Sequence, residues 1–368
     1  MTEEQELEEV VEGTTRVLVP VDRTDNGPGK KMGRVFYNRQ MAFNRDVSVM
    51  FFAHPDVRPT RALDAMAATG ARAVRIMKEV GPDLEFHIND WEKVSADVIQ
   101  RNVDLNQAER CVVRNEDLKC LLAHERFDYV DLDPFGTPVP FLHSAIQGLR
   151  KKGILAMTAT DTAPLAGTHA KKCVRRYQAR PCRCVFGHEV GLRLLIGYVG
   201  RQAAMFDKGI EPLLCFYADH YMRLYVRLPE SADAADASLA KLGYFKFDRA
   251  SHERTILEDY EAGASGPIWI GDIIDHDFIQ KMPLLDTLAE KDRCAKYLQL
   301  WKDELNVPFF YENNELSSDL HVSPPRQDRL LEGLSEIGKV SKTHFSPTGF
   351  KCDQPYSVVK ERYRQLFT

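Results

Sequence analysis

The chain of 368 residues is 44% hydrophobic and 28% charged, which is ordinary for a globular protein and fits two domains better than one. No stretch holds the roughly 18 consecutive apolar residues that a membrane span needs, and the acidic N-terminus lacks the apolar region of a secretory signal, so we expect a cytoplasmic protein with no membrane partner. The net charge of −5 argues mildly against nucleic acid as a partner, because domains that bind it are often basic.

Between residues 61 and 161, short apolar runs alternate with amphipathic segments. Apolar runs of this length predict buried strands, and apolar positions at helical spacing predict helices. In chain order we expect strands at 61–66, 84–90, 110–117, 127–135 and 154–161, and helices at 70–80, 91–106, 118–125 and 138–153. This alternation predicts an α/β fold with a parallel, doubly wound sheet, whose ligands bind at the carboxyl ends of the strands.

The second half of the chain shows a different pattern. Residues 211–228 are two apolar runs split by Ala-Asp-His, which predicts two late antiparallel strands of the same sheet. The stretch PESADAADAS at 229–238 changes composition and is the best candidate for a linker. Beyond it we expect strands around Trp269, helices within 283–305, and a helix with a two-stranded wing at 331–352. The sequence therefore predicts two domains, residues 1–228 and a smaller α+β domain at 229–368.

Aspartates stand at the ends of four successive expected strands: Asp64, Asp90, Asp117 and Asp133. Asp64 precedes a turn that ends at Gly70 and opens a helix with free amides. Twenty residues beyond this glycine, Asp90 stands where an acid can bind both hydroxyls of a ribose. Each aspartate alone is explained as a helix cap, and the pattern G-x-G-x-x-G is absent. Together they favour a nucleoside-containing cofactor, because capping does not require an acid.

The tetrapeptide Asp133-Pro134-Phe135-Gly136 is the most specific of these strand ends. Proline restricts its own backbone and that of the residue before it, which makes a rigid bend from which Asp133 can face a substrate. The ring of Phe135 can stack on a flat base. An acceptor for an amine hydrogen beside a clamp for a ring is what methylation of an exocyclic amine requires. An ordinary Asp-Pro turn is the simpler alternative.

Residues 169–183 carry six cations and no acid: Lys171, Lys172, Arg175, Arg176, Arg180 and Arg183. A solvated face and contact with phosphate explain such a run about equally well.

Nine segments, taken in this order, resemble the tRNA guanine-26 N2-dimethyltransferase family in its archaeal and eukaryotic form. They are VFYNRQMAFNRDVSV (35–49), LDAMAATGARAVR (63–75), NDW (89–91), VDLDPFGTPVPFL (130–142), TATDTAPLAG (158–167), GHEVGLRLLIG (187–197), DHYMRLYVR (219–227), GPIWIG (266–271) and SKTHFSPTGFKCDQP (341–355). The resemblance covers nearly the whole chain. It implies a class I (Rossmann-like) methyltransferase domain, a C-terminal tRNA-binding domain, and transfer of one or two methyl groups from S-adenosylmethionine to N2 of guanine 26 in tRNA. Nothing in the sequence calls for an obligate protein partner.

By position in these motifs, the resemblance implies five contacts with the cofactor: Arg45, Arg72, Asp90, Asp117 and Leu118. Asp90 corresponds to the ribose-binding acid, and Asp117 with Leu118 corresponds to the adenine end. Composition alone would assign both arginines to the surface.

The same correspondence makes Asp133 the catalytic aspartate, with Pro134 and Phe135 beside it in the motif. Phe36 and Phe135 are the expected base-stacking residues. The basic run would supply tRNA phosphate contacts through Lys171, Lys172, Arg175 and Arg176.

We expect no metal. None of the eight cysteines forms a C-x-x-C pair, and the closest spacing is Cys182-Arg183-Cys184, whereas a zinc site usually needs two such close pairs. Some relatives of the resembled family carry paired cysteines before the GPIW motif, and this chain has none there. Reduced thiols are therefore the prediction.

Three other functions compete with this interpretation. An Asp-Pro-aromatic turn would suit an amino-methyltransferase acting on adenine or cytosine equally well. A non-catalytic tRNA-binding protein with a vestigial cofactor fold is disfavoured by the four acids, and a dehydrogenase by the missing phosphate-binding glycines. Mono- or dimethylation, and modification of position 27, remain open at this point.

Overall fold

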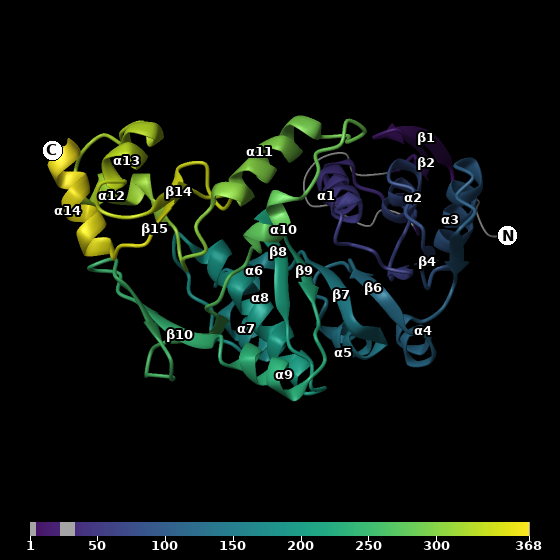
Figure 1. Ribbon diagram of the computed structural model, residues 1–368, viewed down its shortest axis with the longest axis horizontal. Helices are drawn as coiled ribbons and strands as arrows, with labels where there is room; N and C mark the ends of the chain where they lie inside the picture. Colours follow the sequence, from purple (N-terminus) through teal and green to yellow (C-terminus); the bar gives the residue numbers. More distant parts are fainter. Residues whose placement is uncertain (1–4, 23–33, 368) are drawn as a thin grey trace. The chain divides into compact units, whose positions relative to one another are not determined.

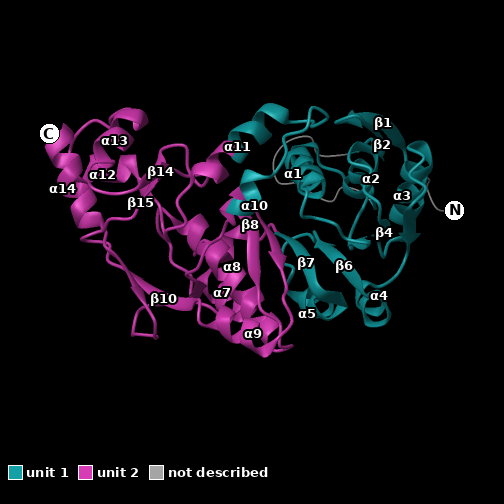
Figure 2. Cartoon of the chain, viewed as in Figure 1, with its two compact units in different colours: residues 1–158, 277–298 teal, residues 159–276, 299–368 magenta. Residues whose placement is uncertain are grey.

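The computed structural model describes residues 5–22 and 34–367, so the first four residues of the acidic N-terminus lie outside the described part. The chain divides into two compact units, each built from two segments (Figure 2). The first unit comprises 1–158 and 277–298, and the second comprises 159–276 and 299–368. No helix within the described ranges is both long and apolar enough to cross a membrane.

Parallel strands form the centre of the first unit, in the order β5-β4-β3-β6-β7. The strands are β3 (Arg61–Asp64), β4 (Glu85–Asn89), β5 (Cys111–Arg114), β6 (Phe127–Leu132) and β7 (Leu149–Ala159). The helices are α1 (Ala42–Ala53), α2 (Ala71–Glu79), α3 (Lys93–Leu105), α4 (Leu118–His124) and α5 (Val139–Gly148), preceded by the 3-10 turn η1 (Arg39–Met41). Figure 1 shows α1, α2 and α3 on one side of these strands and α4 and α5 on the other. The expected α/β fold is confirmed.

A hairpin that the sequence had not indicated begins the first unit. Strands β1 (Leu7–Glu12) and β2 (Thr15–Pro20) pair antiparallel. The turn between them needs Gly13, whose φ is +66° and whose absent Cβ would lie 2.5 Å from the Glu79 carboxylate. The hairpin is therefore packed closely against α2.

The segment 277–298 returns to the first unit after the chain has passed through the second. It includes most of α10 (His276–Gln280) and the beginning of α11 (Lys291–Asp303). The fully buried carboxylate of Asp46 accepts the amides of Ala289 at 3.1 Å and Glu290 at 2.6 Å. A segment that lies 243 residues later in the sequence thus donates two backbone hydrogen bonds to a buried side chain of α1.

Short sheets and helices make up the second unit. Strands β8 (Glu211–Ala218) and β9 (Tyr221–Arg227) pair antiparallel, as expected. Two three-stranded sheets follow, in the orders β11-β10-β12 and β13-β15-β14. Their strands are β10 (Leu242–Phe247), β11 (Arg254–Leu257), β12 (Ser265–Trp269), β13 (Tyr311–Glu312), β14 (Val340–Lys342) and β15 (Gly349–Cys352). The helices are α6 (Thr162–Leu165), α7 (Ala170–Tyr177), α8 (Gly187–Ala204), α9 (Ala232–Leu239), α12 (Asn313–Asp319), α13 (Gln327–Leu334) and α14 (Tyr356–Phe367).

A buried ionic cluster ties distant parts of the second unit together. Lys351 on β15 is fully buried, and its ammonium lies 3.0 Å from Glu189 of α8 and 3.4 Å from Glu304. The Glu304 carboxylate also contacts His344 at 2.6 Å.

Two expected elements are wrong. The helix expected to run to Gly153 ends at Gly148, and β7 begins at Leu149 because this residue pairs with Phe127 of β6. The expected linker at 229–238 contains α9 instead, since the Ser231 hydroxyl accepts the Ala234 amide at 3.1 Å and caps an alanine-rich helix. The two-domain division at residue 228 stays a prediction.

Candidate active site

The first unit brings the predicted acids to one edge of the parallel strands. Asp64 is the last residue of β3 and is 2% exposed, while Asp90 follows β4 directly and Asp133 follows β6 directly. Because β4, β3 and β6 are neighbours in the sheet, these carboxylates share the edge at which such sheets bind ligands.

Asp90 is locked to the turn that opens α2. Its Oδ2 accepts the amide of Ala68 at 2.9 Å, and its Oδ1 accepts the amide of Glu92 at 3.0 Å. The turn bends sharply, with Ala68 and Gly70 both in the left-handed region at φ +52° and +73°. The amides that begin α2 and the carboxylate expected to bind ribose therefore form one fixed group.

Asp117 lies three residues beyond the end of β5 and caps α4. Its Oδ1 accepts the amides of Lys119 at 2.8 Å and Cys120 at 3.2 Å, and the residue is exposed. The neighbouring Leu118 is buried. The capping alternative thus applies to Asp117, and its contact with an adenine stays a prediction.

Arg72 of α2 faces the predicted catalytic aspartate. Its Nη2 donates to Oδ2 of Asp133, and its Nη1 donates to Asn44 Oδ1 and Ser48 Oγ, both at 2.7 Å. Its Nε lies 3.7 Å from Oδ2 of Asp131. The Arg72 side chain is only 7% exposed, so the group that holds Asp133 is itself buried in the protein.

Sequence reasoning missed Asp131. This residue is fully buried in β6, and its carboxylate also accepts the Tyr129 hydroxyl at 2.9 Å. The sequence did contain a signal for it: Asp131 stands between the apolar residues Val130 and Leu132 of a strand expected to be buried. A buried charge requires a partner, so this acid could have been expected to pair with a cation.

Phe135, two residues beyond Asp133, packs against a second aromatic ring. Phe135 is 56% exposed, and its ring centroid lies 4.5 Å from that of Phe36 in an edge-to-face arrangement. Asp133 itself is 20% exposed. A hydrogen-bond acceptor thus lies two residues from the exposed ring of Phe135, and the stacking of a base on either ring stays a prediction.

Arg45 belongs to a buried ionic cluster. Its guanidinium makes two bonds to Glu12 of β1, at 2.6 and 2.5 Å, and Arg75 bonds the same carboxylate at 2.9 Å. Burial alone would raise the pKa of Glu12, but the two arginines lower it to about 2. The structure therefore places Arg45 against the N-terminal hairpin, and its expected contact with a cofactor stays a prediction.

The predicted phosphate-binding cations lie on α7 of the second unit. Arg176 donates to the Asp161 carboxylate at 2.7 Å. Lys171, Lys172 and Arg175 have no carboxylate partner among residues 5–22 and 34–367. Three of the four are thus available for an anion.

Comparison with known proteins gives four concordant matches: one family model, two relatives and one solved structure. Residues 13–364 match the family model of N2,N2-dimethylguanosine tRNA methyltransferase. The tRNA (guanine(26)-N(2))-dimethyltransferase of Thermococcus kodakarensis is 40% identical, over 97% of this chain and 98% of the relative. The protein of the same name from Pyrococcus abyssi is 38% identical, over 96% and 97%. The structure of Trm1 from Pyrococcus horikoshii in complex with S-adenosyl-L-methionine is similar with a TM-score of 0.88, at 35% identity over 97% of this chain and 99% of that one.

Proposed function

The chain belongs to the N2,N2-dimethylguanosine tRNA methyltransferase family, and we propose that it transfers methyl groups from S-adenosylmethionine to the exocyclic N2 amine of guanine 26 in tRNA. The observation that carries this proposal is the carboxylate of Asp133, held by Arg72 at the end of β6 beside the exposed ring of Phe135. Since its substrate is tRNA, we also propose that it acts in the cytoplasm.

The residues at the sheet edge fit the methyl donor. When bound, the donor supplies an electrophilic methyl group on a sulfonium centre. Asp90, fixed by the Ala68 amide, would hold the ribose hydroxyls, and Asp117 with Leu118 would border the adenine. Arg72 borders this region from α2, and its contact with the donor remains part of the proposal.

Asp133 would act on the acceptor amine. The lone pair of a guanine amine is delocalised into the ring, so the amine must be oriented before it can attack. A carboxylate that accepts the N–H orients the nitrogen and stabilises the positive charge that develops on it as the N–C bond forms. The carbonyl of Pro134 would accept the second N–H. As the N–C bond forms, the bond between the methyl carbon and the sulfonium sulfur breaks and leaves a neutral thioether, and the amine would pass one proton to the Asp133 carboxylate and from there to water. A second transfer to the same nitrogen would give N2,N2-dimethylguanine.

The aromatic pair would hold the guanine. Guanine 26 lies within the folded tRNA, so the base must leave its stack to reach Asp133. Stacking on an aromatic side chain contributes about 1–3 kcal/mol per base, and Phe135 with Phe36 offers such a surface. Lys171, Lys172 and Arg175 of α7 would bind tRNA phosphates, with Arg176 contributing less because of its pairing with Asp161.

The test uses an unmodified tRNA transcript and a labelled donor. After incubation, the RNA is digested to nucleosides and separated by chromatography. Label in N2-methylguanosine and N2,N2-dimethylguanosine, absent when guanine 26 is replaced by adenine, is the expected result. Label in a methylated adenosine or cytidine would support the competing amino-methyltransferase, and no label would favour a non-catalytic tRNA-binding protein.

A further inference from the structure

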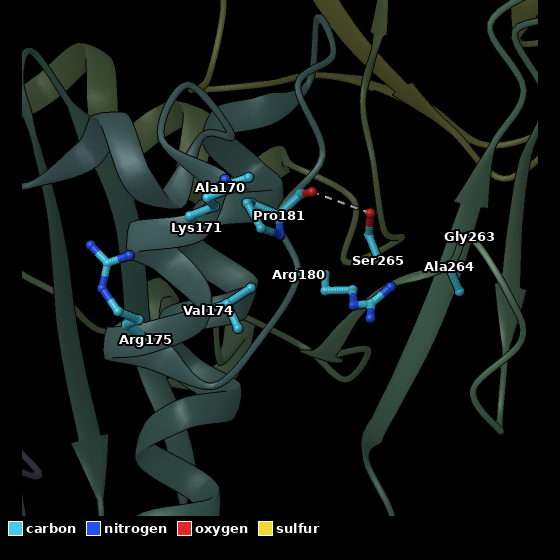
Figure 3. A pocket seen from close by; sticks show the side chains of 9 residues that line it. All are labelled: Ala170, Lys171, Val174, Arg175, Arg180, Pro181, Gly263, Ala264 and Ser265. Carbon is cyan, nitrogen blue, oxygen red and sulfur yellow. Dashed lines mark hydrogen bonds between the residues drawn. The ribbon is translucent and has the colours of Figure 1, made fainter.

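An open hollow of about 600 Å³ lies in the second unit (Figure 3). One wall is α7, and the other is formed by residues 180–181 and 263–265. The lining residues are Ala170, Lys171, Val174, Arg175, Arg180, Pro181, Gly263, Ala264 and Ser265. Three of them are cations and none is an acid, so the hollow favours an anionic occupant.

One face of α7 turns its cations and an apolar residue to this hollow. Val174 and Arg175 follow Lys171 by three and four residues, so each lies on the same side of the helix as Lys171. Lys172 and Arg176 do not line the hollow. Val174 is 44% exposed, and in Figure 3 it lies between the side chains of Arg175 and Arg180. An apolar floor thus lies among charged groups.

The opposite wall is fixed by hydrogen bonds. Arg180 and Gly266 exchange both backbone bonds at 2.8 Å, and the Ser265 hydroxyl donates to the Pro181 carbonyl at 3.4 Å. The guanidinium of Arg180 donates to the Tyr260 hydroxyl at 3.0 Å and lies over that ring. This wall is therefore formed before any ligand arrives, which reduces the entropy that binding costs.

We propose that this hollow binds one nucleotide of the tRNA other than the target guanine, with its base against Val174 and Pro181 and its phosphates against Lys171 and Arg175. The inference rests on the proposed function and adds a second contact between enzyme and RNA. A volume of about 600 Å³ lies within the range of small-ligand sites, roughly 300–1,000 Å³. A fully stacked helix would present only phosphates and would leave the apolar floor uncovered, so the occupant is a nucleotide displaced from its stack.

The experiment fills the hollow without changing its charge. Val174→Trp is compared with Val185→Trp, which alters a valine of similar exposure, 48%, outside the hollow. Binding of unmodified tRNA transcript to the full chain is measured at several salt concentrations. We expect Val174→Trp to weaken binding about tenfold or more with the salt slope unchanged, and Val185→Trp to stay within twofold of the unmodified protein. Lys171→Ala with Arg175→Ala should lower the slope by about 0.7–0.9 per lost phosphate contact.

Each result has one meaning. Normal tRNA binding by Val174→Trp overturns the proposal. If the double alanine variant nevertheless lowers the salt dependence of tRNA binding, the cations contact phosphate only as a charged surface. Normal binding by every variant also overturns it and leaves the hollow to another occupant, such as an acidic peptide. Ala170→Trp, which fills the hollow from the same helix, replaces Val174→Trp if that variant fails to bind donor in calorimetry. Absence of methylation by the unmodified chain would instead refute the proposed function, which separates the two failures.

Discussion

Replacing Arg72 by methionine separates two roles of this side chain. Its guanidinium lies 3.7 Å from the fully buried Asp131 and also holds Asp133, which is partly exposed. The substitution Arg72→Met removes the positive charge that faces Asp131 and the hydrogen-bond donor that orients Asp133. Loss of the charge should lower the free energy of unfolding, and loss of the hydrogen-bond donor should lower the turnover rate.

The magnitudes follow from these distances. At 3.7 Å and an effective dielectric constant of about 20, two unit charges attract by about 4.5 kcal/mol. Breaking a buried pair by removing one partner costs about 3–5 kcal/mol, so Arg72→Met should lower the free energy of unfolding by about that amount. Adding Asp131→Asn removes the buried charge and should restore most of this loss. Turnover should remain about 100-fold low in both variants, because a displacement of about 1 Å in a reacting group costs about that much.

Denaturant unfolding measures the first effect, and single-turnover methylation measures the second. Calorimetry with S-adenosylmethionine serves as the control for donor binding. A double variant as unstable as Arg72→Met would refute the pairing with Asp131. Normal turnover in the double variant would show that Asp133 needs no positioning by Arg72. A defect confined to donor affinity would make Arg72 a contact of the cofactor instead.

Four further outcomes follow from the site and its surroundings. Asp133→Ala should lower kcat at least ~100-fold, as loss of one such electrostatic group usually does, with donor affinity within twofold; near-normal single turnover would sink this mechanism. Asp90→Ala should weaken donor binding about tenfold or more, since unpaired ribose hydroxyls cost roughly 1–3 kcal/mol, and unchanged affinity by calorimetry would remove Asp90 from the site. Phe135→Ala should raise the KM for tRNA by about 5- to 150-fold, equivalent to one lost stacking contact of about 1–3 kcal/mol, while Phe135→Tyr should retain activity; equal KM values for both variants would exclude stacking. Burial opposes ionisation of Glu304, yet nearby cations lower its pKa to about 2. The ionised carboxylate therefore stabilises the protein fully above the pKa of the unfolded chain, about 4.3, and this stabilisation is lost as the pH falls towards 2. In Glu304→Gln, the unfolding free energy should depend less on pH between these two values.

Features that depend on neighbours in the sequence could be predicted. The alternation of apolar runs and amphipathic segments is a local property, and it located the five parallel strands of the first unit. The position at which a strand ends is also a local property of the sequence, so the sequence alone places Asp90 and Asp133 at the carboxyl ends of parallel strands. The bend after Asp133 follows from Pro134 alone.

Features that depend on partners far along the chain could not be predicted from the sequence. Arg72 and Asp133 are 61 residues apart, and Arg45 and Glu12 are 33 apart. Composition would assign both arginines to the surface, and only the packing of α1, α2 and the N-terminal hairpin brings each of them to its carboxylate.

Composition also misled at one place. The stretch 229–238 is small and polar, which is typical of linkers, yet it forms most of α9. The small residues allow a close approach of this helix to a neighbouring loop: a Cβ added at Gly209 would lie 2.3 Å from the Ala234 carbonyl oxygen. Such a fit depends on tertiary contact and leaves no local periodic signal.

The late return of residues 277–298 to the first unit matters while the protein is being synthesised. A ribosome adds about 5–20 residues per second, so the 159–276 segment separates the two parts of the first unit by on the order of 10 s. During this interval Asp46 lacks the amides of Ala289 and Glu290, and Phe43 lacks the guanidinium of Arg293, which lies 4.2 Å from its ring in the finished fold. The nascent chain therefore carries an unfinished first unit while the second is already emerging, and a gene fragment that stops at residue 228 encodes neither unit whole.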